Sequence, residues 1–399
     1  MGPDWEWDVS VLGGCGHVGL PLGLALADSG LRVSLYDTNH TATRLVMSGA
    51  MPHREPGADE VLQRVLEAGR LTACTQAASI SVAEHVIVVI GTPVDKHLNP
   101  DPQAVVAAVE AVSEHLVDGQ LLVLRSTVFP GVTRLVERLV ERLGKDIDVA
   151  FCPERIAEGK AMEELYSLPQ IVASRTDRAL DRAEWLFSQL TKSVVRVQPE
   201  EAELAKLFTN SYRYIKFAAA NQLYMMANDF GVDYERVRAA VVEDYPRAAD
   251  LPGPGFAAGP CLLKDTMQLA AFNNNNFALG LASMQVNEGL PLYLVARLAT
   301  KHDLGSMTVG ILGMAFKGES DDVRDSLAYK LKRVLEIQAK SVLTTDPYVT
   351  TDAALRPLDR VLAESDLLII GAPHRIYADL ETDKPVVDIW NLRGRGVLV

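Results

Sequence analysis

Cys261 combines a reactive residue type with a position suited to covalent chemistry. It ends a glycine- and proline-rich segment, residues 252–260, and precedes a predicted helix, with Lys264 and Asp265 beside it. A thiol has an unperturbed pKa of about 8.5, so it needs a cation or a helix N-terminus to act as a nucleophile at neutral pH. Cys261 would have both if Lys206 and the start of that helix converge on it. The arrangement predicts a thiolate that attacks a carbonyl carbon.

A glycine pattern near the N-terminus predicts a second chemical component. Residues 14–19 match G-x-G-x-x-G, follow an apolar segment at 8–14 and open a predicted helix. Gly14 would allow the tight turn, Gly16 the close approach of a pyrophosphate and Gly19 close helix packing. The pattern therefore predicts a dinucleotide site, and a glycine-rich turn of another α/β protein is the alternative interpretation.

The acid that follows this pattern predicts which dinucleotide binds. Asp37 ends the second predicted strand, residues 31–36. A carboxylate there accepts a hydrogen bond from a ribose 2′-hydroxyl and repels a 2′-phosphate, which favours NAD over NADP. Cys15 and His17 lie inside the pattern, where filling a variable position is the favoured role and a functional role is the alternative.

Four polar residues recur along one predicted helix. They are Glu203, Lys206, Asn210 and Arg213. Their spacing of 3, 4 and 3 residues places them on one face of the helix. A solvated stripe with an ion pair between Glu203 and Lys206 is one interpretation. Asn is a poor helix former, however, and a cation beside an amide suits a developing oxyanion. Lys206 and Asn210 are therefore candidate catalytic residues.

Loops that follow the predicted strands carry further candidates. Thr92 and Pro93 follow one strand, and Ser126 and Thr127 follow the next. Such loops line the binding crevice of a parallel sheet. Thr127 would contact a reacting hydroxyl or a water, unless its hydroxyl caps its own turn. Glu154 follows a third strand and is either a water-orienting base or part of a surface ion pair.

Lys317 and Arg324 lie after a strand near the C-terminus. Two cations at the carboxyl end of a strand would hold an anionic substrate, and an exposed charged loop is the alternative.

The order of apolar segments predicts an α/β fold. Strands alternate with helices over residues 1–199, the segment 200–302 is helical, and residues 303–399 return to α/β. We therefore predict two Rossmann-like, doubly wound parallel-sheet domains joined by a central all-helical region. The three ranges are the expected domains.

Composition excludes several classes of protein. The 399 residues carry a net charge of −13, which disfavours nucleic-acid binding. The sequence has no apolar run of about 18 residues that is free of charged residues, so we expect no membrane span. The N-terminus does not resemble a signal peptide. The four cysteines show no metal-ligand spacing, so we expect no metal site and no disulfide framework. A reducing cytoplasm is the expected location.

Taken together, these motifs resemble the nucleotide-sugar 6-dehydrogenase family, which oxidises UDP-glucose, GDP-mannose or UDP-N-acetylmannosamine. The resemblance runs from about Val9 to Asn391. It rests on the glycine pattern, Gly-Thr-Pro at 91–93, Ser-Thr-Val at 126–128, Pro153-Glu154, Lys206 with Asn210, the Cys261 loop and Phe316-Lys317 with Arg324.

The resemblance implies a four-electron oxidation with two NAD. Cys261 would add to the C6 aldehyde, and oxidation of the thiohemiacetal would give a thioester that water hydrolyses to the uronate. Lys206 and Asn210 would stabilise the oxyanion. Glu154, with Thr127 and Asp265, would orient water and relay protons.

Binding roles follow from the same resemblance. The implied substrate-binding residues are Glu154, Arg155, Lys206, Asn210, Arg213, Arg247, Gly255 and Lys317. The implied cofactor-binding residues are Gly14, Gly16, His17, Val18, Gly19, Asp37, Thr92, Pro93, Ser126, Thr127 and Arg324. Family members assemble as homodimers or larger oligomers through the central helices, and Arg247 resembles an arginine that reaches a neighbouring subunit's substrate.

Some residues depart from the family pattern. The loop reads Gly-Phe-Ala-Ala-Gly-Pro-Cys at 255–261, where UDP-glucose members usually have Gly-Phe-Gly-Gly-Ser-Cys. Lys264-Asp265 resembles the UDP-glucose type, whereas residues 252–255, 212–213 and 245–247 resemble the N-acetylhexosamine type. The sugar stays open, and UDP is favoured over GDP by analogy. A two-electron β-hydroxyacid dehydrogenase and an inactive NAD-binding scaffold are the alternative functions.

Overall fold

The computed structural model describes residues 5–92, 94–95 and 97–399. The chain forms two compact units, Met1–Phe208 and Thr209–Val399. The boundary falls within the long helix α8 (Pro199–Asp229). Pro93, an expected cofactor contact, lies outside the described residues.

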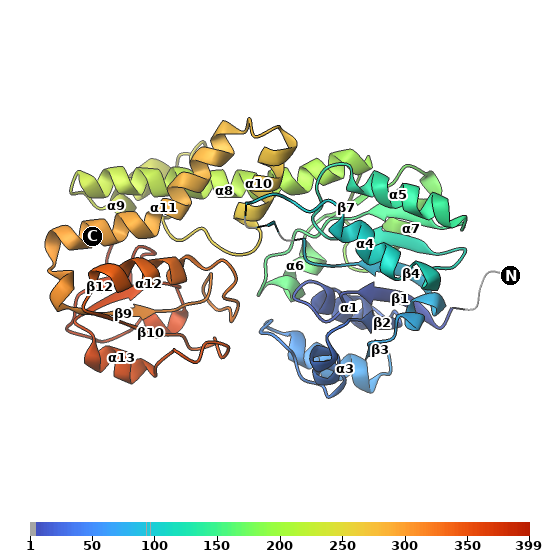
Figure 1. Ribbon diagram of the computed structural model, residues 1–399, viewed down its shortest axis with the longest axis horizontal. Helices are drawn as coiled ribbons and strands as arrows, with labels where there is room; N and C mark the ends of the chain where they lie inside the picture. The colour runs from blue at the N-terminus through green and yellow to red at the C-terminus, as the bar shows by residue number, and fades with distance from the viewer. Residues whose placement is uncertain (1–4, 93, 96) are drawn as a thin grey trace. The chain divides into compact units, whose positions relative to one another are not determined.

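The first unit is built on one large sheet (Figure 1). Within the described residues its eight strands have the order β3-β2-β1-β4-β5-β6-β7-β8. The strands are β1 (Trp7–Leu12), β2 (Val33–Tyr36), β3 (Leu71–Cys74), β4 (Ala83–Val88), β5 (Leu121–Leu124), β6 (Asp148–Phe151), β7 (Gln170–Ala173) and β8 (Val194–Val197). All neighbours are parallel except β6 and β7. The expected all-parallel sheet therefore gains an antiparallel pairing, a common extension of parallel sheets.

Helices cover both faces of this sheet because its strands are apolar on both sides. Ile87 of β4 joins one core, whereas its neighbours Val86 and Val88 join the other. The first core includes residues of α1 (Gly19–Asp28), α2 (His40–Met47), α3 (Ala58–Glu67), α6 (Ala161–Ser167) and α7 (Asp177–Ser188). The second includes residues of α4 (Ala104–Ala111) and α5 (Val132–Leu143). The doubly wound arrangement is confirmed.

The second unit holds the rest of α8, a helical segment and a smaller sheet (Figure 1). The sheet is parallel, with the order β10-β9-β11-β12 in the described residues. Its strands are β9 (Thr308–Leu312), β10 (Ser341–Thr345), β11 (Leu367–Ile370) and β12 (Val386–Val387). The helices are α9 (Tyr234–Val242), α10 (Leu262–Phe272), α11 (Ala278–Lys301), α12 (Leu327–Gln338) and α13 (Leu358–Glu364).

This smaller sheet is also covered on both faces. Val309 and Ile311 of β9 pack in a core with residues of α11 and α12, whereas Leu312 packs with Val361 of α13. Helices at 200–302 and α/β structure beyond residue 303 match the expected element types. Sequence reasoning did not predict β3, α2, α3 or α13. Among the described residues, no helix is both long and apolar enough to cross a bilayer.

A buried carboxylate connects α8 to helix α5 of the first unit. Glu203 is 1% exposed and accepts hydrogen bonds from the backbone N–H groups of Gly131 at 2.7 Å and Thr133 at 2.8 Å. The Thr133 hydroxyl donates to the same side chain at 2.6 Å. Glu203 therefore caps the N-terminus of α5, where the helix dipole favours a negative charge.

We expect Glu203→Gln to lower the free energy of unfolding by about 1–3 kcal/mol, because it weakens charge-assisted hydrogen bonds to buried donors. Urea unfolding followed by circular dichroism measures the change. Glu200→Gln is the matched control, since Glu200 lies on the first turn of the same helix in an exposed ion pair with Arg175. Equal effects of the two substitutions would contradict the capping role.

Candidate functional site

The glycine pattern forms a tight turn before α1. Gly13 has φ +80° and carries the turn that sequence reasoning assigned to Gly14. A Cβ on Gly14 would lie 2.8 Å from Cβ of Leu35, so Gly14 serves close packing on β2. A Cβ on Gly19 would lie 2.3 Å from the Gly13 carbonyl oxygen, whereas one on Gly16 would meet nothing closer than 3.6 Å. Gly16 therefore leaves the backbone open at the start of α1, as an anion site requires.

Asp37 lies at the end of β2, beside this turn. Its carboxylate accepts hydrogen bonds from the N–H groups of Cys15 at 3.0 Å and Asn39 at 2.9 Å. Two of its roughly four lone pairs stay available, which suits a ribose diol. Burial, with the nearby Asp37 charge, raises the pKa of Cys15 to about 12, so Cys15 is a neutral packing residue.

His17 has different neighbours from those expected of a cofactor contact. Its ring lies 4.1 Å from that of His53, and its Nδ1 is 3.9 Å from a carboxylate oxygen of Glu158. Val18 is the N-cap residue of α1. Both residues flank the turn, and their contact with the cofactor stays a prediction.

Hydrogen bonds join the loops that follow β4 and β5. The Ser126 hydroxyl accepts from the N–H of Ile90 at 2.8 Å, and the Thr92 hydroxyl donates to the Thr127 carbonyl at 2.7 Å. The expected residues of these two loops therefore lie together at the carboxyl edge of the sheet, where α/β sheets bind ligands.

Glu154 forms a buried ion pair rather than the surface pair considered from the sequence. One carboxylate oxygen accepts from Nε of Arg125 at 3.0 Å and from its Nη2. The other oxygen accepts from the N–H groups of Arg155 at 2.7 Å and Ile156 at 3.0 Å. Four donors occupy its roughly four lone-pair sites, so no site remains for a water. This geometry disfavours the expected role of Glu154 as a base.

Arg125 and Glu55 are supporting residues that sequence reasoning missed. Arg125 also donates to the Cys152 carbonyl and to Gln170, each at 3.0 Å. Glu55, 2% exposed, accepts from the N–H groups of Gly159 and Ala161 at 2.8 Å and so fixes the loop after Glu154. An arginine directly after an apolar strand was a visible signal for Arg125, whereas Glu55 had none.

Arg155, an expected substrate contact, lies in the same loop. Its guanidinium donates to the Pro169 carbonyl, before β7. A role in substrate binding stays a prediction.

The polar stripe on α8 is mostly buried, so it is not a solvated helix face. Lys206 is 8% exposed and Asn210 is 4% exposed. Glu203 caps α5 instead of forming the ion pair with Lys206 that the spacing allowed. Arg213 is exposed. Burial of an amine and an amide one turn apart on a helix is unusual for a purely structural face and keeps both as catalytic candidates.

Cys261 and its neighbours form the reactive part of the second unit. Cys261 is exposed and is the N-cap residue of α10. Asp265 lies one turn later, fully buried, and accepts from the amide of Asn210 at 2.5 Å. Its other oxygen is 3.1 Å from Nζ of Lys264. The structure thus brings together Asn210, Asp265 and the helix that begins after Cys261.

The loop before Cys261 runs close to aromatic side chains. A Cβ on Gly255 would lie 2.4 Å from the Trp390 ring, and one on Gly259 would lie 2.6 Å from the Phe316 ring. The structure describes both Ala257 and Ala258, and neither has a positive φ. The two alanines that depart from the family pattern therefore fit the loop without backbone strain.

The loop after β9 holds the two expected cations. Nζ of Lys317 lies 5.3 Å from the centre of the Phe316 ring. Arg324 forms an ion pair with Asp322, whose two carboxylate oxygens lie 3.0 and 2.8 Å from Nε. Arg247 is exposed, with its guanidinium 5.8 Å from the centre of the Tyr245 ring. These placements leave the three binding roles as predictions.

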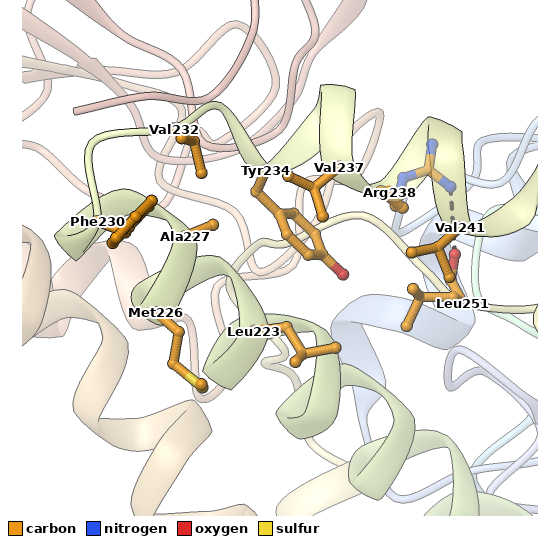
Figure 2. Close-up of a pocket in the computed structure, with 10 residues that line it drawn as sticks. All are labelled: Leu223, Met226, Ala227, Phe230, Val232, Tyr234, Val237, Arg238, Val241 and Leu251. Carbon is orange, nitrogen blue, oxygen red and sulfur yellow. Dashed lines mark hydrogen bonds between the residues drawn. The ribbon is translucent and has the colours of Figure 1, made fainter.

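An apolar groove lies between α8 and α9 in the second unit (Figure 2). Figure 2 shows Leu223 and Met226 on α8 and Val237 and Val241 on α9 among the residues that line the groove, with Phe230 just after the end of α8. Phe230 is 85% exposed and Met226 is 60% exposed. Large apolar side chains gathered at such exposure indicate an interaction surface.

Family models match the chain in three consecutive parts. The UDP-glucose/GDP-mannose dehydrogenase NAD binding domain matches residues 8–191, the central domain matches 200–288 and the UDP binding domain matches 310–394. The chain belongs to the UDP-glucose/GDP-mannose dehydrogenase family. It is therefore an NAD-dependent dehydrogenase of a nucleotide sugar.

Individual members of this family resemble the chain over most of its length. The UDP-N-acetyl-D-mannosamine dehydrogenase of Pyrococcus horikoshii is 30% identical over 92% of this chain and 89% of its own. The solved structure of that organism's enzyme has a TM-score of 0.87, covering 94% of this chain and 91% of that chain. A UDP-glucose dehydrogenase structure from Pyrobaculum islandicum has a TM-score of 0.89 at 29% identity, covering 97% and 95%.

We expect Asp37→Asn to weaken NAD binding about tenfold or more while weakening NADP binding less, because it removes the charge at the ribose. Isothermal titration calorimetry with both dinucleotides measures this. Asp28→Asn is the control, since Asp28 forms a surface ion pair with Arg64 at the end of α1. An unchanged ratio of the two affinities would remove Asp37 from cofactor selection.

Proposed function

We propose that the protein oxidises the C6 alcohol of a UDP-sugar to the uronic acid through a thioester on Cys261. The observation that carries the proposal is the exposed Cys261 at the start of α10, followed one turn later by buried Asp265. An accessible thiol at a helix N-terminus is the arrangement that favours a reactive thiolate.

The chemistry balances with one cysteine and one water. NAD, when bound, supplies the hydride acceptor for each of the two oxidations. The Cys261 thiolate adds to the C6 aldehyde, and the oxygen gains a proton as the thiohemiacetal forms. Loss of hydride and of the hydroxyl proton gives the thioester. Water then attacks the thioester carbon, the C–S bond breaks, and Cys261 leaves as the thiol after protonation.

Asn210 and Asp265 are the residues whose geometry supports roles around Cys261. The Asn210 amide is held by Asp265 at 2.5 Å, which fixes one of its N–H groups and leaves the other to donate to an oxyanion. Asp265 accepts one hydrogen bond and has lone pairs left for a water or a proton. Lys206, also on α8, would supply positive charge, and Thr127 would bind the reacting hydroxyl. Glu154 is not assigned a proton-transfer role.

The proposed sugar is a UDP-N-acetylhexosamine. Curated relatives from Pyrococcus horikoshii, Methanococcus maripaludis and Yersinia pestis are UDP-N-acetyl-D-mannosamine dehydrogenases. The sequences at 212–213, 245–247 and 252–255 support the same choice. UDP-glucose is the second candidate, favoured by Lys264-Asp265 and by the likeness to the Pyrobaculum islandicum enzyme.

We expect two NADH and one uronate per sugar when the protein is given NAD and UDP-N-acetylmannosamine, with UDP-glucose tested in parallel. Absorbance at the NADH band and mass spectrometry of the product measure both. Cys261→Ser should reduce uronate formation by about a thousandfold or more while NAD affinity stays within about twofold, because it removes only the nucleophile.

Cys74→Ser is the matched control, since Cys74 is a partly buried cysteine of β3 in the first unit. One NADH with free aldehyde would favour the two-electron alternative. Unchanged uronate output from Cys261→Ser would remove the thioester from the mechanism.

We further propose that the groove between α8 and α9 binds a second copy of the chain. Exposed residues 212, 219, 223 and 226 of α8, with residue 230 just after its end, recur at spacings of 7, 4, 3 and 4, which place them along one stripe. The stripe runs over about 18 residue steps, which corresponds to roughly 27 Å at the rise of an α-helix, and it is suited to pairing with the same stripe about a two-fold axis. Exposed Arg247, after α9, would then be available to the partner's substrate.

Met226→Glu should convert the protein to monomers, because it places a charge within an apolar contact. Sedimentation velocity or light scattering measures the mass. Ile337→Glu is the control, since Ile337 is 86% exposed on α12 and lies outside the groove. A dimer that survives Met226→Glu at micromolar concentration would place the interface elsewhere.

A further inference from the structure

We infer that Trp390 is a positioning residue for Cys261, acting through a fixed path of the loop 255–261. This inference rests on the proposed role of Cys261 as nucleophile. Trp390 lies in the segment after β12 and belongs to none of the motifs of the sequence.

Gly255 lies against the indole ring of Trp390. This glycine has φ +154°, and a Cβ on it would lie 2.4 and 2.5 Å from Cζ3 and Cε3 of Trp390. The neighbouring Phe256 meets the same indole edge-to-face, with ring centres 5.9 Å apart. The loop backbone therefore lies directly on the six-membered ring of Trp390, a contact that only glycine permits.

Buried polar groups also hold the backbone of Gly255. Asn221 of α8 accepts from the Gly255 N–H at 2.9 Å and donates to its carbonyl at 3.0 Å. Asn287 of α11 accepts from the same Asn221 amide at 2.9 Å and donates to the Tyr214 carbonyl at 3.1 Å. Both asparagines are at most 1% exposed, so this hydrogen-bond network is buried and favours one geometry of the loop.

Trp390 is itself fixed to the smaller sheet. Its indole N–H donates to the carbonyl of Ile370, the last residue of β11, at 3.1 Å. Its backbone N–H donates to Asp388 at 3.1 Å. The ring also packs against both apolar cores of the sheet. Trp390 is therefore held in place by the smaller sheet, and its ring fixes the position of Gly255 relative to that sheet.

A second contact lies two residues before Cys261. Gly259 has φ +99°, a Cβ there would lie 2.6 Å from the Phe316 ring, and its N–H donates to the Asp325 carbonyl at 3.4 Å. Phe316 and Asp325 belong to the loop after β9 that carries Lys317 and Arg324. The smaller sheet and its loops therefore set the position of the thiol at two points, Gly255 and Gly259.

Iodoacetamide labelling of the full chain, resolved by peptide mass spectrometry, tests the inference without cofactor or sugar. The rate at Cys261 is measured from about pH 6 to about pH 10. We expect Trp390→Leu to slow labelling near neutral pH about threefold or more and to move the midpoint to higher pH, because the loosened thiol leaves the N-terminus of α10. Trp390→Phe should return the profile toward the wild type.

Two matched controls accompany these variants. Cys74 reports on the same molecules from the first unit, and Trp185→Leu removes a tryptophan of α7 that is 49% exposed. Gly255→Ala tests the contact from the loop side if Trp390→Leu does not fold, and it should shift the Cys261 profile in the same direction. The inference would be overturned if Trp390→Leu and Gly255→Ala both gave the same Cys261 labelling profile as the wild-type protein. It would also be overturned if the labelling midpoints of Cys74 and Cys261 moved by the same amount.

A turnover measurement separates this inference from the proposed function. Wild-type protein that forms one NADH per sugar would overturn the thioester mechanism, while the labelling profiles would still decide whether Trp390 positions Cys261. If the wild-type protein forms two NADH per sugar, Trp390→Leu should form fewer than two NADH per sugar and release the aldehyde, because the Cys261 thiol no longer captures the aldehyde.

Discussion

Buried carboxylates that accept hydrogen bonds from backbone N–H groups hold the functional loops in place. Glu203 caps α5, Glu55 fixes the loop at 159–161, and Glu154 binds the backbone that follows it. In the smaller sheet, Asp346 accepts from the N–H groups of Met314 and Ala315 in the loop after β9. An ionised acid in such a site is stabilised only while these N–H donors stay in position. Moving the loop would leave a buried charge without hydrogen bonds, which costs free energy, so the carboxylate holds the loop in place.

Hydrogen bonds also decide the charge state of Asp346. Burial alone would raise its pKa, yet the bond from His374 and the backbone donors lower the pKa to about 2. The carboxylate therefore stays ionised at all ordinary pH values. Asp37 occupies the corresponding place after β2 in the larger sheet and accepts from the N–H of Cys15. The two Rossmann-like sheets thus use the same acid-to-turn contact after their second strand.

Local patterns predicted most of the elements, and contacts distant in sequence explain most of what they missed. The glycine turn, Asp37 and the helix after Cys261 were visible because each is defined by neighbours within one turn or one strand. Glu154 was expected to be a base or part of a surface ion pair, and its buried pairing was missed because its partner Arg125 lies 29 residues away, after another strand. Glu55 bonds to residues more than 100 positions later, and Trp390 meets Gly255 from the far end of the chain. No periodicity in a single sequence reports such pairs.

Residues of the same type acquire different chemistry from what surrounds them. Burial raises the pKa of Cys152 to about 12, as it does for Cys15, whereas Cys261 is exposed at the start of a helix. The acids divide in the same way. Four donors saturate Glu154, while Asp265 accepts one hydrogen bond from Asn210 and faces Lys264. A carboxylate can take a proton or orient a water only through a lone pair that is not already used. Asp265 can therefore take a proton or orient a water, whereas the lone pairs of Glu154 are all used in hydrogen bonds that hold the fold.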